Sequence, residues 1–366
     1  MEFEVKSASI ECGLGHACTF CPQEVTCSLE KSRHNRVLIE NRLSEINQII
    51  IVLSNKGGVG KSTVSTNLAA GLALRGFRVG VADADIHGPN QSVFFGFAES
   101  HTKLDDAGLK PLEFSAENVS NPVRIGSLAF LMDDDTTPIV WRDAYKHDFI
   151  HHLVGSFNWN SLDFLIVDMP PGTGNELITL SDMLEGSNLA AVLVTTPQAV
   201  AQMDTLKAAR FCKERGIPIV GAVENMAGVI CPHCNGEFHI FPNDKLDAAL
   251  RSMGVEKLTS IPLAPELALR SDSGEPVVTS APKSAVAATF GPLIEACVRL
   301  GQQSFDGSVA HGLHDAFSQN LANAELMQRL ASLPEGGVAM GKEIAELLDQ
   351  ELERLRSAAI GGRTVP

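Results

Sequence analysis

A glycine-rich run between an apolar stretch and a helical pattern constrains this chain more than any other feature. The run is Lys56-Gly57-Gly58-Val59-Gly60-Lys61-Ser62-Thr63. Its glycines allow a tight turn that points consecutive N–H groups at phosphate oxygens, and the helix that begins near Lys61 adds its positive N-terminal end. We expect Lys61 to reach the β- and γ-phosphates of a nucleotide and the Ser62 hydroxyl to ligate Mg²⁺.

Strand-like apolar runs alternate with helix-like stretches from Gln48 onwards. In the first helical pattern Val64, Leu68 and Leu72 share one face, and the pattern ends at Arg75-Gly76. The alternation predicts an α/β fold with a mostly parallel, doubly wound sheet, helices on both faces and a ligand site at the carboxyl ends of the strands. The candidate strands are Ile49–Ser54, Arg78–Asp83, Val123–Ser127, Phe164–Asp168, Leu189–Thr195 and Pro218–Val223.

Aspartates follow two of these candidate strands. Asp168 ends one apolar strand, and we expect it to orient Mg²⁺ through water. The run Val81-Ala82-Asp83-Ala84-Asp85 places two more carboxylates at another strand end. Phosphoryl transfer at a phosphate loop depends on positioning and charge neutralisation and needs no covalent nucleophile. The chain is therefore predicted to be an ATP hydrolase that uses ATP and Mg²⁺.

Six of the eight cysteines are clustered. Four fall between Cys12 and Cys27, two form the pair Cys231 and Cys234, and two stand alone in helix-like stretches, where inert buried thiols are expected. In a reducing cytoplasm, clustered cysteines indicate metal ligands or redox sites rather than structural disulfides.

The N-terminal cluster has its own spacing. Cys12, Cys18, Cys21 and Cys27 contain one CxxC pair flanked by single cysteines, unlike the double CxxC of structural zinc ribbons. Thiolate ligation at this compact spacing suits a four-iron, four-sulfide cluster, and zinc is the alternative.

Charge and composition limit the partners. The formal net charge is −15, which argues against nucleic acid and anionic membrane. No apolar run reaches membrane-spanning length, and the first residues lack the basic and apolar regions of a signal peptide, so we expect a cytoplasmic protein. The expected parts are a four-cysteine metal segment (1–30), a P-loop ATPase domain with a CxxC pair (31–300) and a helical extension (301–366) with helices at 309–331 and 338–357.

Lys56 distinguishes this phosphate loop from others. Asn55 stands where the strict Walker A pattern has glycine, and a lysine at the start of the loop resembles the signature lysine of the deviant Walker A class, which includes MinD/ParA proteins. That resemblance implies a homodimer in which Lys56 reaches the partner's nucleotide. It also implies that Asp85 positions the attacking water and that Asp83 lies nearer the magnesium shell.

A second set of motifs spans about two-thirds of the chain. It consists of Val223-Glu224-Asn225-Met226-Ala227-Gly228 followed by Cys231-Pro232-His233-Cys234, together with Asp168–Gly174, Thr195–Gln198 and Ile261–Leu263. Together these motifs resemble those of the Mrp/ApbC/Nbp-type iron–sulfur carrier ATPases. The resemblance implies an ATP-dependent carrier whose Cys231 and Cys234, from two subunits, bridge one labile [4Fe-4S] cluster for transfer to apoproteins. It also implies that Asn225 contacts adenine. The N-terminal cysteines resemble those of the Nbp-type scaffolds.

Other functions fit parts of the pattern. Two Cys231/Cys234 pairs across a dimer can hold zinc, and CPHC is also a thiol-oxidase motif. One rival is therefore a MinD/ParA-like positioning or regulatory ATPase with structural zinc, which would need a membrane or DNA surface. A second is an electron-donating ATPase, although its bridging cysteines lie far apart in sequence.

Overall fold

The computed structural model describes residues 12, 14–86, 88–131, 150–172, 174–230, 234, 236–241 and 246–302. The chain divides after Gly301 into two units. The helices predicted at 309–331 and 338–357 belong to the second unit and lie outside the described residues. The predicted three-part organisation stays a prediction.

The described helices alternate with strands along the chain and pack on the two faces of the main sheet. In that part of the chain, no helix is long and apolar enough to cross a membrane. The α-helices are α1 (Lys31–Ser44), α2 (Lys61–Leu74), α3 (Gln91–Phe94), α5 (Asn175–Met183), α6 (Ala199–Glu214), α7 (Leu246–Ser252), α8 (Pro265–Asp272), α9 (Val277–Ser280) and α10 (Ala285–Thr289), with further helical residues at 150–155 and 291–302 and short 3₁₀ turns at Cys18–Phe20 and Leu128–Leu131.

The main sheet of the described residues has nine strands. Its order is β10-β9-β8-β1-β7-β2-β6-β5, and β11 also pairs with β9. All pairs are parallel except β5 with β6 and β10 with β9. The strands are β1 (Ile46–Leu53), β2 (Val79–Asp83), β5 (Leu112–Phe114), β6 (Val123–Ser127), β7 (Leu162–Asp168), β8 (Leu189–Thr195), β9 (Ile219–Ile230), β10 (Glu237–Phe238) and β11 (Lys257–Leu263); β3 (Leu104–Asp105) and β4 (Gly108–Leu109) form a separate hairpin.

All six predicted strands are confirmed, as is the first helix. Two boundaries differ. The strand predicted to begin at Ile49 begins already at Ile46, as β1, directly after α1 ends at Ser44. Strand β9 runs on to Ile230, well past the predicted end at Val223. Strand β11 was not predicted, because Lys257–Leu263 carries Thr, Ser and Pro residues and is only partly buried.

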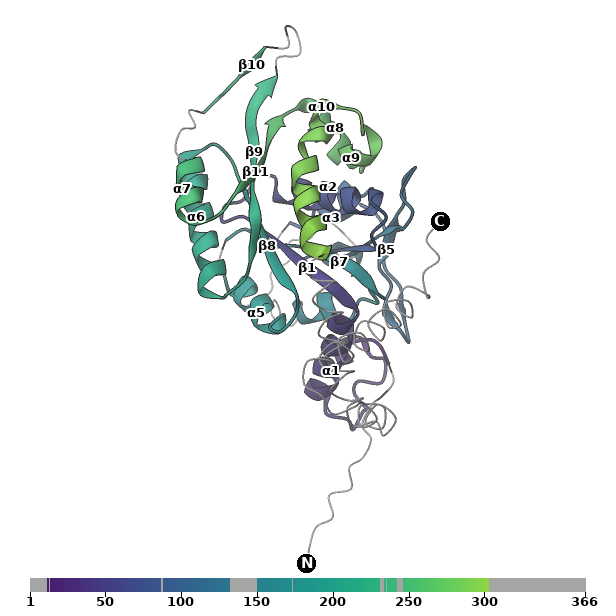
Figure 1. Ribbon diagram of the computed structural model, residues 1–366. Coiled ribbons are helices and arrows are strands. Elements are labelled where there is room, and N and C mark those ends of the chain that lie inside the picture. The colour runs from purple at the N-terminus through teal and green to yellow at the C-terminus, as the bar shows by residue number, and fades with distance from the viewer. Residues whose placement is uncertain are drawn as a thin grey trace, which may run out of the picture. The chain divides into compact units, whose positions relative to one another are not determined.

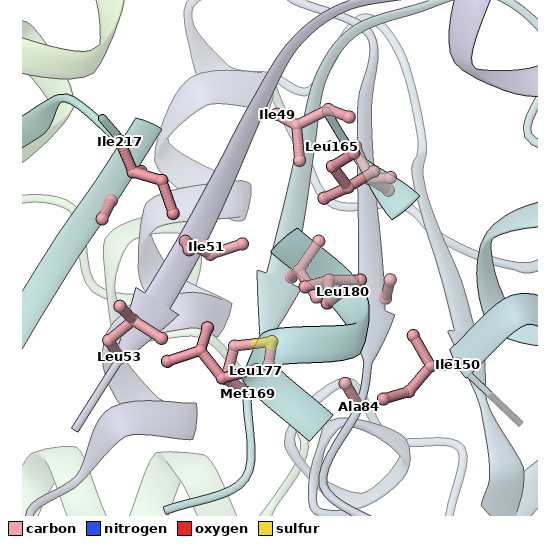
Figure 2. Close-up of a cluster of buried hydrophobic side chains, with 14 of the residues drawn as sticks. Ile49, Ile51, Leu53, Ala84, Ile150, Leu165, Met169, Leu177, Leu180 and Ile217 are labelled. Atoms are coloured by element: carbon pink, nitrogen blue, oxygen red, sulfur yellow. The ribbon is translucent and has the colours of Figure 1, made fainter. Parts of the chain in front are cut away.

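Strand β1 lies at the centre of the sheet and faces a hydrophobic core on each side. Ile49, Ile51 and Leu53 pack on the side that carries α5 and α6, as Figure 2 shows for part of that core. Ile50 and Val52 pack on the side that carries α2 and helical residues 291–302. Burial on both faces explains why the strand is continuously apolar instead of alternating. The doubly wound arrangement predicted from the sequence is visible in Figure 1.

The N-terminal cysteine segment is bonded to the sheet domain. The Gly15 N–H donates to the Asp106 carbonyl at 2.7 Å. The Arg42 guanidinium of α1 donates to Asn158 Oδ1 at 2.9 Å, to the Gly15 carbonyl at 3.1 Å and to the Ala107 carbonyl. A Cβ atom at Gly15 would overlap the Ala107 carbonyl, so glycine is needed for this approach. Because α1 leads into the amino end of β1, the segment lies at the sheet edge opposite the phosphate loop (Figure 1).

Candidate nucleotide site and cysteine sites

The phosphate loop connects the carboxyl end of β1 to α2. Gly58 and Gly60 have φ angles of 76° and 82°, which favour glycine, and Gly60 is the N-cap of α2. A Cβ atom at Gly60 would also collide with the side chain of Asn225. The turn therefore depends on these glycines for both conformation and space. The loop lines a pocket formed by Ser54, Lys56, Gly57, Gly58, Val59, Gly60, Lys61, Ser62, Thr63, Asp85, Asn90, Phe94 and Pro171.

Lys61 is held inside this site by carboxylates. Its Nζ lies 2.6 Å from Asp168 Oδ1 and 3.9 Å from Asp85 Oδ2. Lys61 is 5% exposed and Asp168 is completely buried, so this ion pair is shielded from solvent and each charge depends on the other. The structure thus brings together the predicted phosphate lysine and two of the predicted aspartates.

Asp83 and Asp168 lie side by side because β2 and β7 are parallel neighbours. They form a register pair at the carboxyl ends of those strands. Asp83 Oδ2 accepts hydrogen bonds from the Gln91 N–H (3.1 Å) and the Ser127 hydroxyl (3.2 Å). Burial raises the pKa of Asp83 to about 8 and the Asp168 charge adds to the rise, whereas the Gln91 N–H and Lys61 lower it. In the absence of a cation, the site therefore favours a proton on Asp83.

This raised pKa predicts an unusual pH dependence of stability. The folded pKa lies above the ordinary value of 3.8, so the stability contributed by the Asp83 proton is present at low pH and is lost as the pH rises through about 8. Asp83→Asn mimics the protonated form permanently. In EDTA, the melting temperature of Asp83→Asn relative to wild type should therefore increase between pH 6 and pH 9, by about 2–4 °C for each kcal/mol involved. The exposed control Asp272→Asn should show no such trend. A constant difference for Asp83→Asn would contradict this assignment.

Gln91 and Ser127 were not identified from the sequence. Gln91 is fully buried and its side-chain Nε2 donates to Asp168 Oδ2 at 2.8 Å. Its signal in the sequence is weak, because a glutamine after a Gly-Pro-Asn turn resembles any polar helix start. Only the meeting of β2, β7 and α3 shows that it touches both aspartates.

Lys56 lies at the mouth of the site. Its Nζ donates to Gln198 Oε1 at 3.5 Å, and its side chain is part of the pocket wall. Gln198 is the N-cap of α6, and Val200 and Met203 at the start of that helix are 60% and 64% exposed. Lys56 therefore contacts the residue that precedes two exposed apolar side chains. The predicted role of Lys56 across a dimer stays a prediction.

Strand β9 connects the phosphate loop to the second cysteine site. Its pairing with β8 ends at Glu224. The next residue, Asn225, is 5% exposed and donates from Nδ2 to the Val59 carbonyl of the loop at 2.9 Å. From there the strand continues to Ile230, at most about 17 Å further, and pairs with β10. Figure 1 shows this β9–β10 hairpin projecting beyond the sheet.

Cys234 lies at the end of this hairpin and is exposed. Cys231 lies outside the described residues. His239, on the returning side, has its Nδ1 at 2.9 Å from the Ala227 carbonyl. The predicted contact of Asn225 with adenine stays a prediction, since in this structure its amide contacts Val59.

The N-terminal cysteines lie near one another. Cys12 is exposed, and Cys18, Cys21 and Cys27 are partly buried. Burial raises the pKa of the Cys18 thiol, and the neighbouring thiols Cys12, Cys27 and Cys21 raise it further, whereas Lys31 lowers it. Cys12 Sγ also lies 3.3 Å from His34 Nδ1, a contact not foreseen from the sequence. Among the described residues, however, no group of three or more His, Cys, Asp or Glu side chains is placed to hold a metal ion.

The lone cysteines are inert, as expected. Cys212 and Cys297 are both completely buried. Burial raises the pKa of each thiol to about 12. Neither is available as a thiolate ligand at neutral pH.

The donor set of the nucleotide site fits a magnesium nucleotide. Ser62, Asp83 and Asp168 supply hard oxygen ligands of the kind that Mg²⁺ prefers. Lys61 and the N–H groups of the loop supply the positive environment for phosphates. The loop, the adjacent aspartates and the parallel sheet together define a P-loop NTPase.

Comparison with known proteins places the chain more narrowly. The family model ParA, described as NUBPL iron-transfer P-loop NTPase, matches residues 45–298. The chain belongs to this family. The N-terminal cysteines lie outside the matched residues.

Individual relatives agree with that family. The chain is 38% identical over 263 residues to the "Iron-sulfur cluster carrier protein" of Methanocaldococcus jannaschii, covering 71% of this chain and 89% of the relative. It is 37% identical over 270 residues to the "Cytosolic Fe-S cluster assembly factor NUBP2" of Gallus gallus, covering 74% and 96%. A solved nucleotide-binding protein from Archaeoglobus fulgidus, in complex with ADP, is 33% identical with a TM-score of 0.57, covering 65% of this chain and 91% of that one.

Proposed function

We propose that this protein is an ATP-hydrolysing carrier that holds a labile [4Fe-4S] cluster as cargo and transfers it to apoproteins. The observation that carries the proposal is the continuity of β9, which contacts the phosphate loop through Asn225 and then extends into the hairpin that bears Cys234. Family membership and the names of the relatives support the same function.

The residues of the nucleotide site suit ATP hydrolysis. When bound, Mg²⁺ neutralises charge on the β- and γ-phosphates. Lys61 exchanges its ion pair with Asp168 for the phosphates, and the loop N–H groups donate to phosphate oxygens. Ser62 and Asp168 hold the magnesium shell, with Asp83 beside it, and Asp85 orients the attacking water. Loss of the proton from Asp83 accompanies cation binding, because a nearby cation favours the carboxylate.

A second copy of the chain completes the proposed site. Lys56 lies at the pocket mouth and contacts Gln198, which precedes the exposed apolar side chains of Val200 and Met203 on α6. Exposed Phe238 and Ile240 on the hairpin add further apolar surface close to Cys234. A homodimer would cover such residues, pair the Cys231/Cys234 hairpins around one cluster and let Lys56 reach the partner's nucleotide.

Nucleotide state then controls the cargo by population shift. Because Asn225 contacts the Val59 carbonyl, a change in the loop on nucleotide binding alters the base of the hairpin. Differential contacts in the two states favour retention of the cluster in one and release in the other. The N-terminal cysteines form a second, separate cluster site at the opposite edge of the sheet.

The net charge and the name of one relative support the proposed partners and cellular location. A net charge of −15 disfavours nucleic acid and anionic membranes as partners. The name of the chicken relative includes the word cytosolic, in agreement with a cytoplasmic location for this chain.

The first experiment is metal analysis of anaerobically purified full-length protein. We expect iron and sulfide in near-equal amounts, together with a four-iron electron paramagnetic resonance signal after reduction. Stoichiometric zinc without sulfide, even after anaerobic reconstitution, would contradict the carrier function and favour a positioning or regulatory ATPase with structural zinc.

A further inference from the structure

Gln91 occupies the centre of the nucleotide site without belonging to any of the motifs that define it. It is the first residue of α3 and is completely buried. A buried amide must satisfy its donors and acceptor within the protein, so its partners are informative.

Both ends of the Gln91 amide have partners. Nε2 donates to Asp168 Oδ2 at 2.8 Å and to the Ser62 carbonyl at 3.2 Å. Oε1 accepts from the Thr66 hydroxyl at 2.8 Å. The Gln91 amide nitrogen thus connects Ser62, whose hydroxyl is the proposed Mg²⁺ ligand, to Asp168, whose carboxylate is proposed to hold the same ion.

The contacts of Asp168 show why this connection matters. Asp168 Oδ1 is held by Lys61 at 2.6 Å and by the Ser65 hydroxyl at 3.1 Å. Lys61 must leave when it binds phosphate. Gln91 then remains the partner of Oδ2, so it keeps this oxygen in place during the exchange.

The chemistry of glutamine suits this task. A lysine or arginine at this position would neutralise Asp168 and repel Mg²⁺, whereas a glutamate would repel the carboxylate. A neutral amide donates a hydrogen bond without cancelling the charge that attracts the cation. Its second bond, to the Ser62 carbonyl, sets the spacing between the two oxygen donors, and Mg²⁺ demands near-ideal octahedral geometry.

We propose that Gln91 is a positioning residue that organises the magnesium site in advance by tying Asp168 to the Ser62 turn. This inference rests on the proposed function, because it concerns the ion bound with the nucleotide. It predicts that Gln91 matters for the part of nucleotide affinity that depends on Mg²⁺. The part that comes from the loop N–H groups and Lys61 should be independent of Gln91.

The test compares nucleotide affinity with and without Mg²⁺. Gln91→Met keeps approximate length and removes both hydrogen bonds from Nε2. Binding of a fluorescent ADP analogue is measured in Mg²⁺ and in EDTA. We expect the factor by which Mg²⁺ increases the affinity to be at least about tenfold smaller in Gln91→Met than in wild type. This is the typical effect of losing a second-layer contact at a metal site. Its affinity in EDTA should stay within about twofold of wild type, because the phosphate contacts are unchanged.

Gln48 provides a matched control. It is also a buried glutamine, 2% exposed, and its Nε2 donates to the carbonyls of Asn188 (2.7 Å) and Ile49 (3.0 Å). It lies near the amino end of β1, at the opposite edge of the sheet from the loop. Gln48→Met should retain the full Mg²⁺ effect, even if it is less stable.

A milder variant keeps the proposal testable if Gln91→Met does not fold. Thr66→Val removes the hydroxyl that donates to Gln91 Oε1, and it should reduce the Mg²⁺ effect partially and in the same direction. A full Mg²⁺ effect in Gln91→Met, or in Thr66→Val if only that variant folds, overturns the proposal for Gln91 alone. A wild-type protein without any Mg²⁺ effect overturns both this inference and the Mg²⁺-dependent ATP hydrolysis of the proposed function.

Discussion

Lys61→Ala should lower the rate of ATP hydrolysis by roughly 10³-fold or more, the scale set by removal of a cation that stabilises the transferring phosphoryl group. Lys61 is the buried cation at the phosphate loop, only 5% exposed. Steady-state release of phosphate measures the effect. Wild-type turnover in this variant would show that the phosphate site has been misassigned.

The same change should also destabilise the nucleotide-free protein. Removing Lys61 leaves Asp168 completely buried without its 2.6 Å partner, and breaking a buried ion pair from one side costs about 3–5 kcal/mol. Adding Asp168→Asn removes the stranded charge, so the double variant should regain stability and remain inactive. Denaturant unfolding separates the two effects.

Two comparisons complete this test. Lys207→Ala, which removes an exposed lysine paired with Asp204 on α6, should change neither hydrolysis nor stability measurably. Purified Lys61→Ala protein should still hold its cluster, because the cysteines lie outside the nucleotide pocket. Loss of cluster from a folded Lys61→Ala protein would show that Lys61 contributes to the cluster sites.

The second large effect is expected on the transferable [4Fe-4S] cluster. Replacing Cys231 and Cys234 together with alanine should abolish the transferable cluster, because no thiolate remains on the hairpin to bind iron. Activation of an apo-acceptor enzyme should fall to background, while the iron and sulfide bound by the N-terminal cysteines remain. ATP hydrolysis should persist, since the phosphate loop is intact.

The buried cysteines supply the matched control for that variant. Cys212→Ala with Cys297→Ala removes the same number of thiols, but burial raises the pKa of both to about 12. This control should keep its full iron and sulfide content and its transfer rate. An apo-acceptor activated at the wild-type rate by the Cys231/Cys234 variant would refute the carrier function.

The fold could be predicted largely from local pattern. The six apolar runs became the strands of the parallel sheet because a strand buried on both faces must be apolar along its whole length. Strand β11 and the short β10 were not predicted. They are partly exposed, so their sequences lack that signature.

The phosphate loop could be predicted from the sequence for a similar reason. Its function depends on consecutive backbone N–H groups and on glycines with positive φ, which are properties of one continuous segment. Lys61 and Ser62 belong to the same segment, so their roles could be predicted together. The family resemblance, too, rests on short runs of this kind.

The sequence by itself determined the fold class, the phosphate loop, the aspartates that follow the strands and the family. Only the tertiary structure decided which of these groups touch. Gln91 meets Asp168 across 77 positions of the chain, and Asn225 meets Val59 across 166. The physical reason is the strand order: β2 and β7 are neighbours in space although far apart in sequence. Contacts between side chains on such strands leave no periodic or local signal, so hydrogen bonding among buried groups becomes visible only when the sheet is assembled.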